Sequence, residues 1–300
     1  MKRRFVVCLF SGLLAAALSI SPTHATVASH VPKGAIDLGN GAYAVELKKD
    51  TPDWYTPELH ARVVAAGKKG QSVPLPESAE VPQSALLFTG IRPGSWMISP
   101  SWCTLNFVFG GVDSVGTAGH CTGVGEEVTI VAAPGVLMNI GKTVTSVDNG
   151  IGDDFALIDV YPAMEQHVNP SMAIVAGPTG ARPPRLGDAI VHVGHGVVIG
   201  TGGTARPGVV TYPNFPVVSD LFRQNKSDAD AYGWNGAIAP GDSGSAARAV
   251  GGEAVGNVTH IVVGTSYVPA TNAGTTITRI LQIAGQPLST ASLVPDPLGR

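Results

Sequence analysis

The sequence predicts an all-β protein built from antiparallel strands. From residue 91 on, short runs rich in β-branched and aromatic residues are separated by Gly and Pro, a spacing typical of antiparallel sheets. These runs cover residues 104–109, 127–132, 156–160, 189–193, 208–212, 255–263 and 275–280. The chain holds 38 glycines in 300 residues and has no long amphipathic helix before its C-terminus, which disfavours a parallel α/β sheet.

The N-terminus has the three parts of a secretory signal peptide, which we expect to span residues 1–25. Basic residues 2–4 precede an apolar run over residues 5–20, and Thr23-His24-Ala25 places small residues three and one before a cut. The run is shorter than the about 20 apolar residues of a membrane helix and contains Ser and Gly. We therefore expect a secreted chain without stable membrane insertion; the alternative is a retained anchor.

Residues 26–90 have a different composition from the C-terminal remainder of the chain. They include clusters of lysine, a tract broken by proline over residues 73–82, and one helical candidate over residues 57–66. With so little periodic apolar pattern, this segment is not expected to build a core of its own. It is either a removable pro-segment, which would make the chain a zymogen, or an irregular extension draped on the main domain.

Charge and cysteine content narrow the partners and the compartment. Three of the 19 basic residues lie in the signal segment, so 16 remain against 22 acidic residues, and this acidic balance offers no basic footprint for nucleic acid. Cys8 leaves with the signal, and Cys103 and Cys121 remain as an even pair in an oxidising compartment. We expect a Cys103–Cys121 disulfide; the alternative is two buried free thiols.

Three short motifs supply the groups needed for nucleophilic attack on a carbonyl. Ser243 lies in Gly-Asp-Ser-Gly-Ser, His120 in Thr-Ala-Gly-His-Cys, and Asp154 in Asp-Phe-Ala-Leu. A serine hydroxyl attacks only if a base takes its proton, and a buried carboxylate must hold the tautomer of that base. We assign Ser243 as nucleophile, His120 as base and Asp154 as orienting carboxylate, with Asp153 as the competing carboxylate.

Taken in the order His, Asp, Ser, these motifs resemble the trypsin/chymotrypsin superfamily of serine peptidases, and most closely its secreted bacterial branch. The resemblance covers about residues 91–285. It implies two antiparallel six-stranded β-barrels, about residues 91–172 and 173–284, followed by a C-terminal tail, with the active site in the cleft between them. It also implies a serine endopeptidase that works through an acyl-enzyme, and it favours the pro-segment interpretation because bacterial relatives often carry one.

The same resemblance implies further site residues. The backbone N–H groups of Gly241 and Ser243 would form the oxyanion hole. The substrate pocket would be lined by Ala237, Ile238, Thr259, His260 and Ile261. With an alanine and no carboxylate at its base, this pocket disfavours Arg or Lys. It favours small or medium apolar side chains, and His260 leaves acidic side chains as an alternative.

Asp242 needs a different partner from that in the animal enzymes, because the Ile-Val-Gly-Gly segment that supplies their new N-terminus is absent here. We expect an internal cation instead and assign it to His192. His192 and His195 form an HxxH pattern, but residues three apart in a strand face opposite sides, so we expect no metal site. We expect no cofactor, and a monomer that acts on protein or peptide substrates.

Other functions remain open at the sequence level. The Gly-Asp-Ser-Gly-Ser motif alone is also typical of a polar turn. An esterase nucleophile elbow is disfavoured because Ser245 stands where that motif has Gly. A non-catalytic secreted binding protein that keeps the peptidase fold is the main alternative, although all three triad residues are present.

Overall fold

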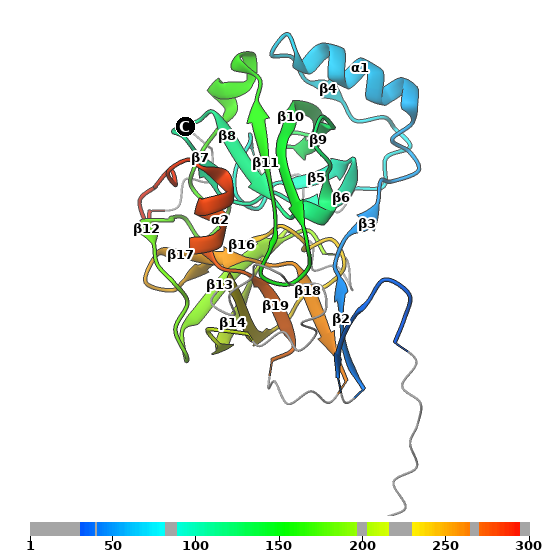
Figure 1. Cartoon of the computed structure of the whole chain (residues 1–300). Coiled ribbons are helices and arrows are strands. Elements are labelled where there is room, and N and C mark those ends of the chain that lie inside the picture. Colours follow the sequence, from blue (N-terminus) through cyan, green and yellow to red (C-terminus); the bar gives the residue numbers. More distant parts are fainter. Residues whose placement is uncertain are drawn as a thin grey trace, which may run out of the picture.

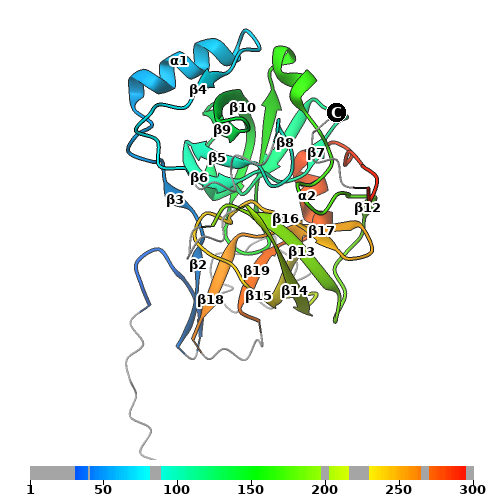
Figure 2. The ribbon, with the colours of Figure 1, turned by 180° about the vertical axis from the view of Figure 1, so that it is seen from behind.

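The computed structural model describes residues 31–39, 41–81, 89–196, 203–215, 230–264 and 270–294. It confirms the all-β class: two large sheets fill the two halves of the molecule, with short helices at the periphery (Figure 1). Figure 2 shows the same two halves from behind, with the N-terminal chain running along one side of both. The expected signal peptide over residues 1–25 lies outside the described residues.

The first sheet is formed mainly by residues up to 160. Its strands are β3 (Lys49–Asp50), β4 (Val73–Pro74), β5 (Trp96–Ser99), β6 (Ser101–Thr104), β7 (Val108–Phe109), β8 (Ser114–Thr117), β9 (Glu127–Ala132), β10 (Val136–Asp148) and β11 (Asp154–Val160). They follow the order β3-β6-β5-β9-β10-β11-β8-β7, and β4 pairs with β10 beside this path. Apolar side chains form a buried core in this half, which includes Leu105, Ile130 and Ile158.

The second sheet combines the C-terminal half with two N-terminal strands. Its strands are β1 (Ile36–Gly39), β2 (Ala42–Glu46), β12 (Gly180–Ala181), β13 (Ala189–Gly194), β14 (Thr204–Tyr212), β15 (Ala231–Gly236), β16 (Ala246–Ala249), β17 (Glu253–Asn257), β18 (His260–Val263) and β19 (Asn272–Thr275). The order is β1-β2-β18-β19-β15-β14-β13-β16-β17-β12. Among the described strands only the β12–β17 pair is parallel.

Each sheet therefore runs between two end strands, and each has more than the six strands that the resemblance implied even before its N-terminal strands are counted. Strand β2 pairs with β18, and β3 pairs with β6. Without these partners β18 and β6 would be edge strands with unpaired N–H and C=O groups, which favours the addition of a further strand. The N-terminal segment, blue in Figure 1, thus crosses from one sheet to the other.

The expected helix near the N-terminus is present as α1 (Pro57–Gly67). The Thr56 side chain caps it by accepting the N–H of Leu59, and Pro57 occupies the first turn, where its missing N–H costs nothing. Leu59 and Val63 are buried in one cluster with Trp96 of the first sheet. Helix α1 is therefore part of the packed structure of this half.

One predicted strand is wrong. The run over residues 275–280 ends strand β19 at Thr275, and helix α2 (Ile277–Ala284) begins two residues later. Ile277, Ile280 and Ala284 are buried on one side, with the three- and four-residue spacing of a helix, and Thr276 caps the helix by accepting the N–H of Arg279. The runs over residues 104–109 and 255–263 are each split between two strands. Strand β6 ends at Thr104 and β7 begins at Val108, whereas β17 ends at Asn257 and β18 begins at His260.

The expected disulfide joins Cys103 of β6 to Cys121, which ends a 3₁₀ turn over Gly119–Cys121. Both cysteines are buried in the core of the first sheet. The bond therefore ties the turn that carries His120 to a neighbouring strand. No helix among the described segments has the length and apolar character to cross a bilayer.

Replacing both cysteines by alanine should lower the free energy of unfolding by about 3 kcal/mol, because the bond closes a loop with a sequence separation of 18. Denaturant titration under oxidising conditions measures this loss. A reducing agent should lower the stability of the native chain and leave that of the double variant unchanged; equal stability of the two oxidised proteins would contradict the expectation.

Candidate active site

Ser243 lies on a tight loop between β15 and β16, and two glycines allow that loop to form. Gly241 and Gly244 have φ values of 105° and 87°, in the left-handed region that disfavours other residues. A Cβ on Gly244 would also lie 2.3 Å from the Thr104 carbonyl oxygen. The loop is held in place because Thr104 donates its N–H to the Ser243 carbonyl oxygen at 2.8 Å.

His120 lies in the 3₁₀ turn that comes after β8. Gly119 allows the turn to approach β10 and β11 closely, since a Cβ there would lie 1.9 Å from the Val147 carbonyl oxygen. The N–H groups of Gly119 and His120 both donate to Asp154 Oδ1, at 2.6 and 3.2 Å. The carboxylate thus holds the backbone of the turn as well as the imidazole ring.

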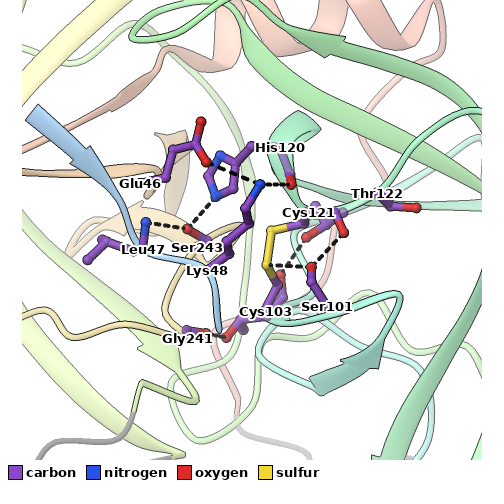
Figure 3. Close-up of a disulfide and its surroundings, with 12 residues drawn as sticks. Glu46, Leu47, Lys48, Ser101, Cys103, His120, Cys121, Thr122, Gly241 and Ser243 are labelled. Atoms are coloured by element: carbon purple, nitrogen blue, oxygen red, sulfur yellow. Dashed lines mark hydrogen bonds and ion pairs between the residues drawn. A yellow bond between two sulfur atoms is a disulfide. The ribbon is translucent and has the colours of Figure 1, made fainter. Parts of the chain in front are cut away.

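The structure brings Ser243, His120 and Asp154 together in one chain of hydrogen bonds. His120 Nδ1 lies 2.7 Å from Asp154 Oδ2, and His120 Nε2 lies 2.6 Å from Ser243 Oγ. All three residues are buried. Figure 3 shows His120 beside Ser243, with the Cys103–Cys121 disulfide adjacent. This is the geometry in which an imidazole can take the serine proton while the carboxylate holds its other nitrogen.

The electrostatics favour an ionised Asp154 and a basic His120. Burial alone would lower the pKa of His120, but the charge and hydrogen bond of Asp154 outweigh it and raise this pKa above 6.5. Burial likewise raises the pKa of Asp154, but the His120 charge and hydrogen bonds more than offset it and hold this pKa below 3.8. The carboxylate is thus charged at neutral pH, and His120 binds a proton more readily than a free imidazole.

The competing carboxylate of Asp153 points elsewhere. Its Oδ1 accepts from Arg279 Nη2 at 2.8 Å, on helix α2. The backbone of Asp154 is held on both sides. Asn257 Nδ2 donates to the Asp154 carbonyl oxygen at 2.9 Å, and the Asp154 N–H donates to Thr275 Oγ1 at 3.1 Å. Strands of the second sheet therefore help to position a carboxylate carried by the first.

A peptide segment of the chain itself lies against the nucleophile. Leu47, which comes directly after β2, is fully buried, and its carbonyl oxygen accepts the N–H of Gly241. Its own N–H lies 3.2 Å from both the Thr259 carbonyl oxygen and Ser243 Oγ. Gly241, expected in the oxyanion hole, thus donates to a peptide carbonyl beside the serine hydroxyl.

Of the five expected pocket residues, Thr259 is fully buried and its carbonyl oxygen lies 3.2 Å from the Leu47 nitrogen; the other four fall into three groups. Ile238 and Ile261 are partly buried and pack in the same apolar cluster as Leu47. His260 borders the triad, with its ring 5.9 Å from that of His120 and its Nδ1 3.9 Å from Asp154 Oδ2. Ala237 is exposed, and its carbonyl oxygen lies 3.1 Å from His192 Nε2.

The expected pairing of Asp242 with His192 is wrong, because Arg206 takes that position. Arg206 Nη1 donates to Asp242 Oδ2, and the N–H groups of Gly196 and Ala239 donate to the same carboxylate, each at 2.7 Å. His192 and Arg206 face each other across the β13–β14 pair. The internal cation is thus one strand away from the expected residue, and an arginine can meet the cost of burying the carboxylate more fully than a histidine.

The two histidines of the HxxH pattern bind separate backbone carbonyls. His192 Nε2 lies close to the carbonyl of Ala237, whereas His195 Nε2 lies 2.8 Å from the Gly94 carbonyl oxygen. Burial lowers the pKa of both, for His195 to about 3. Both rings are therefore neutral at physiological pH and serve the packing behind the Ser243 loop.

Three comparisons relate the chain to known proteins. No family model matches it, and no curated protein matches it. The solved structures similar to it include Cellulomonas bogoriensis chymotrypsin, at 20% identity and a TM-score of 0.48, covering 66% of this chain and 98% of that one. Thermobifida fusca protease A is similar at 19% identity and a TM-score of 0.47, over 67% and 98% of the two chains. The identities are near 20% and the TM-scores below 0.5, so we base the function on the geometry of the site.

Sequence reasoning missed Arg206 and the segment around Leu47. The signal for Arg206 was a single charged residue within an otherwise uncharged strand. The signal for Leu47 was weaker still, since only the lysines after it stood out. Neither residue belongs to a motif, and each meets its partner through long-range contacts.

Replacing Arg206 by methionine should lower the free energy of unfolding by about 3–5 kcal/mol, because it leaves the fully buried Asp242 carboxylate without its cation. Denaturant titration measures the loss. Arg182→Met is the matched control: the Arg182–Asp188 pair is only partly buried, so its loss should cost about 0–1 kcal/mol. Equal costs for the two variants would contradict the role of Arg206.

Proposed function

We propose that the chain is a secreted serine endopeptidase that hydrolyses peptide bonds of protein or peptide substrates through an acyl-enzyme. The observation that supports this most strongly is the unbroken chain of hydrogen bonds from Asp154 through His120 to Ser243. A second feature that supports the proposal is a donor for the oxyanion. The Gly241 N–H fits this role, because it already donates to a peptide carbonyl next to the Ser243 hydroxyl. Signal-peptide secretion and the removal of an N-terminal segment belong to the same proposal.

The chemistry arises directly from these positions. His120 Nε2 takes the proton of Ser243 as its Oγ attacks the substrate carbonyl, and the N–H groups of Gly241 and Ser243 stabilise the oxyanion that forms. His120 then gives the proton to the leaving amine. Asp154 stays ionised and stabilises the protonated imidazole between these steps.

The same arrangement disfavours the non-catalytic binding protein. A lineage that retained only the fold would need neither the 2.6 Å contact of His120 with Ser243 nor three N–H donors on Asp154. A peptide carbonyl received by Gly241 would also serve no purpose there. Each of these features supports acyl transfer.

Replacing Ser243 by alanine should abolish peptide hydrolysis and labelling by a fluorophosphonate probe, because the attacking oxygen is lost. Asp154→Asn should lower kcat on the order of 10⁴-fold by favouring the wrong imidazole tautomer. Labelling is followed during incubation, and the labelled peptide is identified by mass. Label on another residue, or full activity of Ser243→Ala, would contradict the assignment.

Hydrolysis should rise with pH through a midpoint above 6.5. The base must be neutral to take the proton of Ser243, and Asp154 raises the pKa of His120. The initial rate of labelling at Ser243 between pH 5 and 10 measures this midpoint. A flat profile, or a midpoint below 6.5, would be inconsistent with His120 as the base.

A further inference from the structure

The segment from Glu46 to Lys48 lies in the active site in the manner of a substrate. The Leu47 carbonyl accepts the Gly241 N–H, and the Leu47 N–H lies 3.2 Å from Ser243 Oγ. The amide nitrogen and carbonyl carbon of one residue are only about 2.5 Å apart. The hydroxyl therefore lies at most about 5.7 Å from the carbonyl carbon of Leu47, and His120 Nε2 is 2.6 Å from that hydroxyl.

Backbone pairing fixes this segment on both sides of Leu47. On the N-terminal side, Glu46 and Val45 lie opposite His260 and Ile261 in the antiparallel β2–β18 pair. On the C-terminal side, β3 runs antiparallel to β6. An extended peptide recognised by strand addition is held by its main chain, and pockets then read its side chains. Glu46–Lys48 has both kinds of contact.

The pocket that receives the Leu47 side chain is apolar. Leu47 is fully buried in a cluster that includes Ile190, Val210 and Trp234, with Ile238 and Ile261 at its margin. Among the described residues, the one titratable side chain with a ring contact to this cluster is His192, which lies 5.3 Å from the Trp234 ring between centroids and is neutral because burial lowers its pKa. The pocket is thus filled by a leucine side chain and would leave a buried carboxylate or ammonium without a partner.

The residue after Leu47 is exposed to solvent. The Lys48 ammonium lies 3.0 Å from the His120 carbonyl oxygen and 3.2 Å from Glu46 Oε2, as Figure 3 shows. A cavity of ≈ 390 Å³ adjoins Lys48, His120 and Asp148. The site therefore has room beside the bond that links Leu47 to Lys48.

The chain on the two sides of Leu47 is anchored to different halves. After it, Tyr55, Leu59 and Val63 share a buried cluster with Trp96, so this part is built into the first sheet. Before it, Leu38, Ala42 and Ala44 pack against residues of the second sheet such as Val262. The preceding strands β1 and β2 lie at one end of the second sheet, where they can leave without exposing the core of the first half.

We propose that Leu47–Lys48 is the bond that this peptidase cuts in its own chain, and that its pocket selects leucine before the scissile bond. This inference rests on the proposed function. Residues before Lys48 block the site until they leave, while the chain from Lys48 on stays with the mature protein. Ser243 Oγ bonds to the Leu47 carbonyl carbon, the C–N bond to Lys48 breaks, and the Lys48 nitrogen takes the proton from His120. Water then releases the Leu47 carboxylate and restores the Ser243 hydroxyl.

The test monitors the N-terminus of the full chain. Protein is purified at pH 5, where His120 is protonated, and moved to pH 8, and products are identified by N-terminal sequencing and intact mass. The wild-type chain should yield a new N-terminus at Lys48 at a rate independent of protein concentration, and Ser243→Ala should remain intact. If the wild-type chain reacts with the fluorophosphonate probe at Ser243 but its new N-terminus is not Lys48, this inference is overturned while the proposed peptidase function stands.

Variants at Leu47 provide the matched control. Leu47→Met keeps an apolar side chain of similar volume and should still be cut, whereas Leu47→Asp should not be cut at this bond. Cleavage of Leu47→Asp as fast as the wild-type chain would overturn the inference. Absence of both cleavage and labelling at Ser243 in the wild-type chain would instead overturn the proposed function.

Peptides give a measurement that does not depend on how the variants fold. A peptide of residues 42–51 should be cut after its leucine by the processed enzyme. Changing that leucine to alanine should lower kcat/KM by about 10- to 100-fold, because most of the apolar burial is lost. Changing the residue two positions earlier, Val45, to alanine should have a smaller effect. An alanine peptide cut as fast as the leucine peptide would overturn the stated preference.

Discussion

The buried carboxylate of Asp154 is the group on which the rest of the site depends. A fully buried charge is tolerated only when hydrogen bonds replace its water, and Asp154 receives three: from the N–H groups of Gly119 and His120 and from the His120 ring. These bonds fix the 3₁₀ turn, the ring orientation and thereby the direction of Nε2. The disulfide holds the His120 turn from the first sheet, through Cys121. Asn257 of the second sheet holds the backbone of Asp154 by donating to its carbonyl oxygen.

Local motifs are the part that sequence predicted well. Strand β9 has the predicted limits, helix α1 is predicted within one residue, and the three candidate triad residues come together as their motifs indicated. In each case a few neighbouring residues carry the information. Glycines on both sides of Ser243 are needed for its loop whatever surrounds it, and Gly119 is needed wherever a turn meets a strand so closely.

Long-range pairing is the part that sequence did not predict. Arg206 and His192 are directly opposed cross-strand neighbours on the same face of the sheet, so the choice of cation for Asp242 depends on which side chain reaches it in the folded sheet. The run over residues 275–280 predicts a strand because so short a run has no distinctive period. The burial of one side of α2 against its neighbours is what makes this segment a helix. Leu47 meets Ser243 across a sequence separation of 196, which no local pattern encodes.

The position of β2 at the start of the chain and of β18 near its end has a consequence for biosynthesis. A ribosome makes the chain from the N-terminus, so the segment around Leu47 exists long before Gly241 and Ser243 are made. The nucleophile loop and β18 can fold only onto a chain in which this strand is already present. The polypeptide that occludes the triad is therefore older than the triad itself, and it is present in every newly made chain in which Ser243 can meet His120.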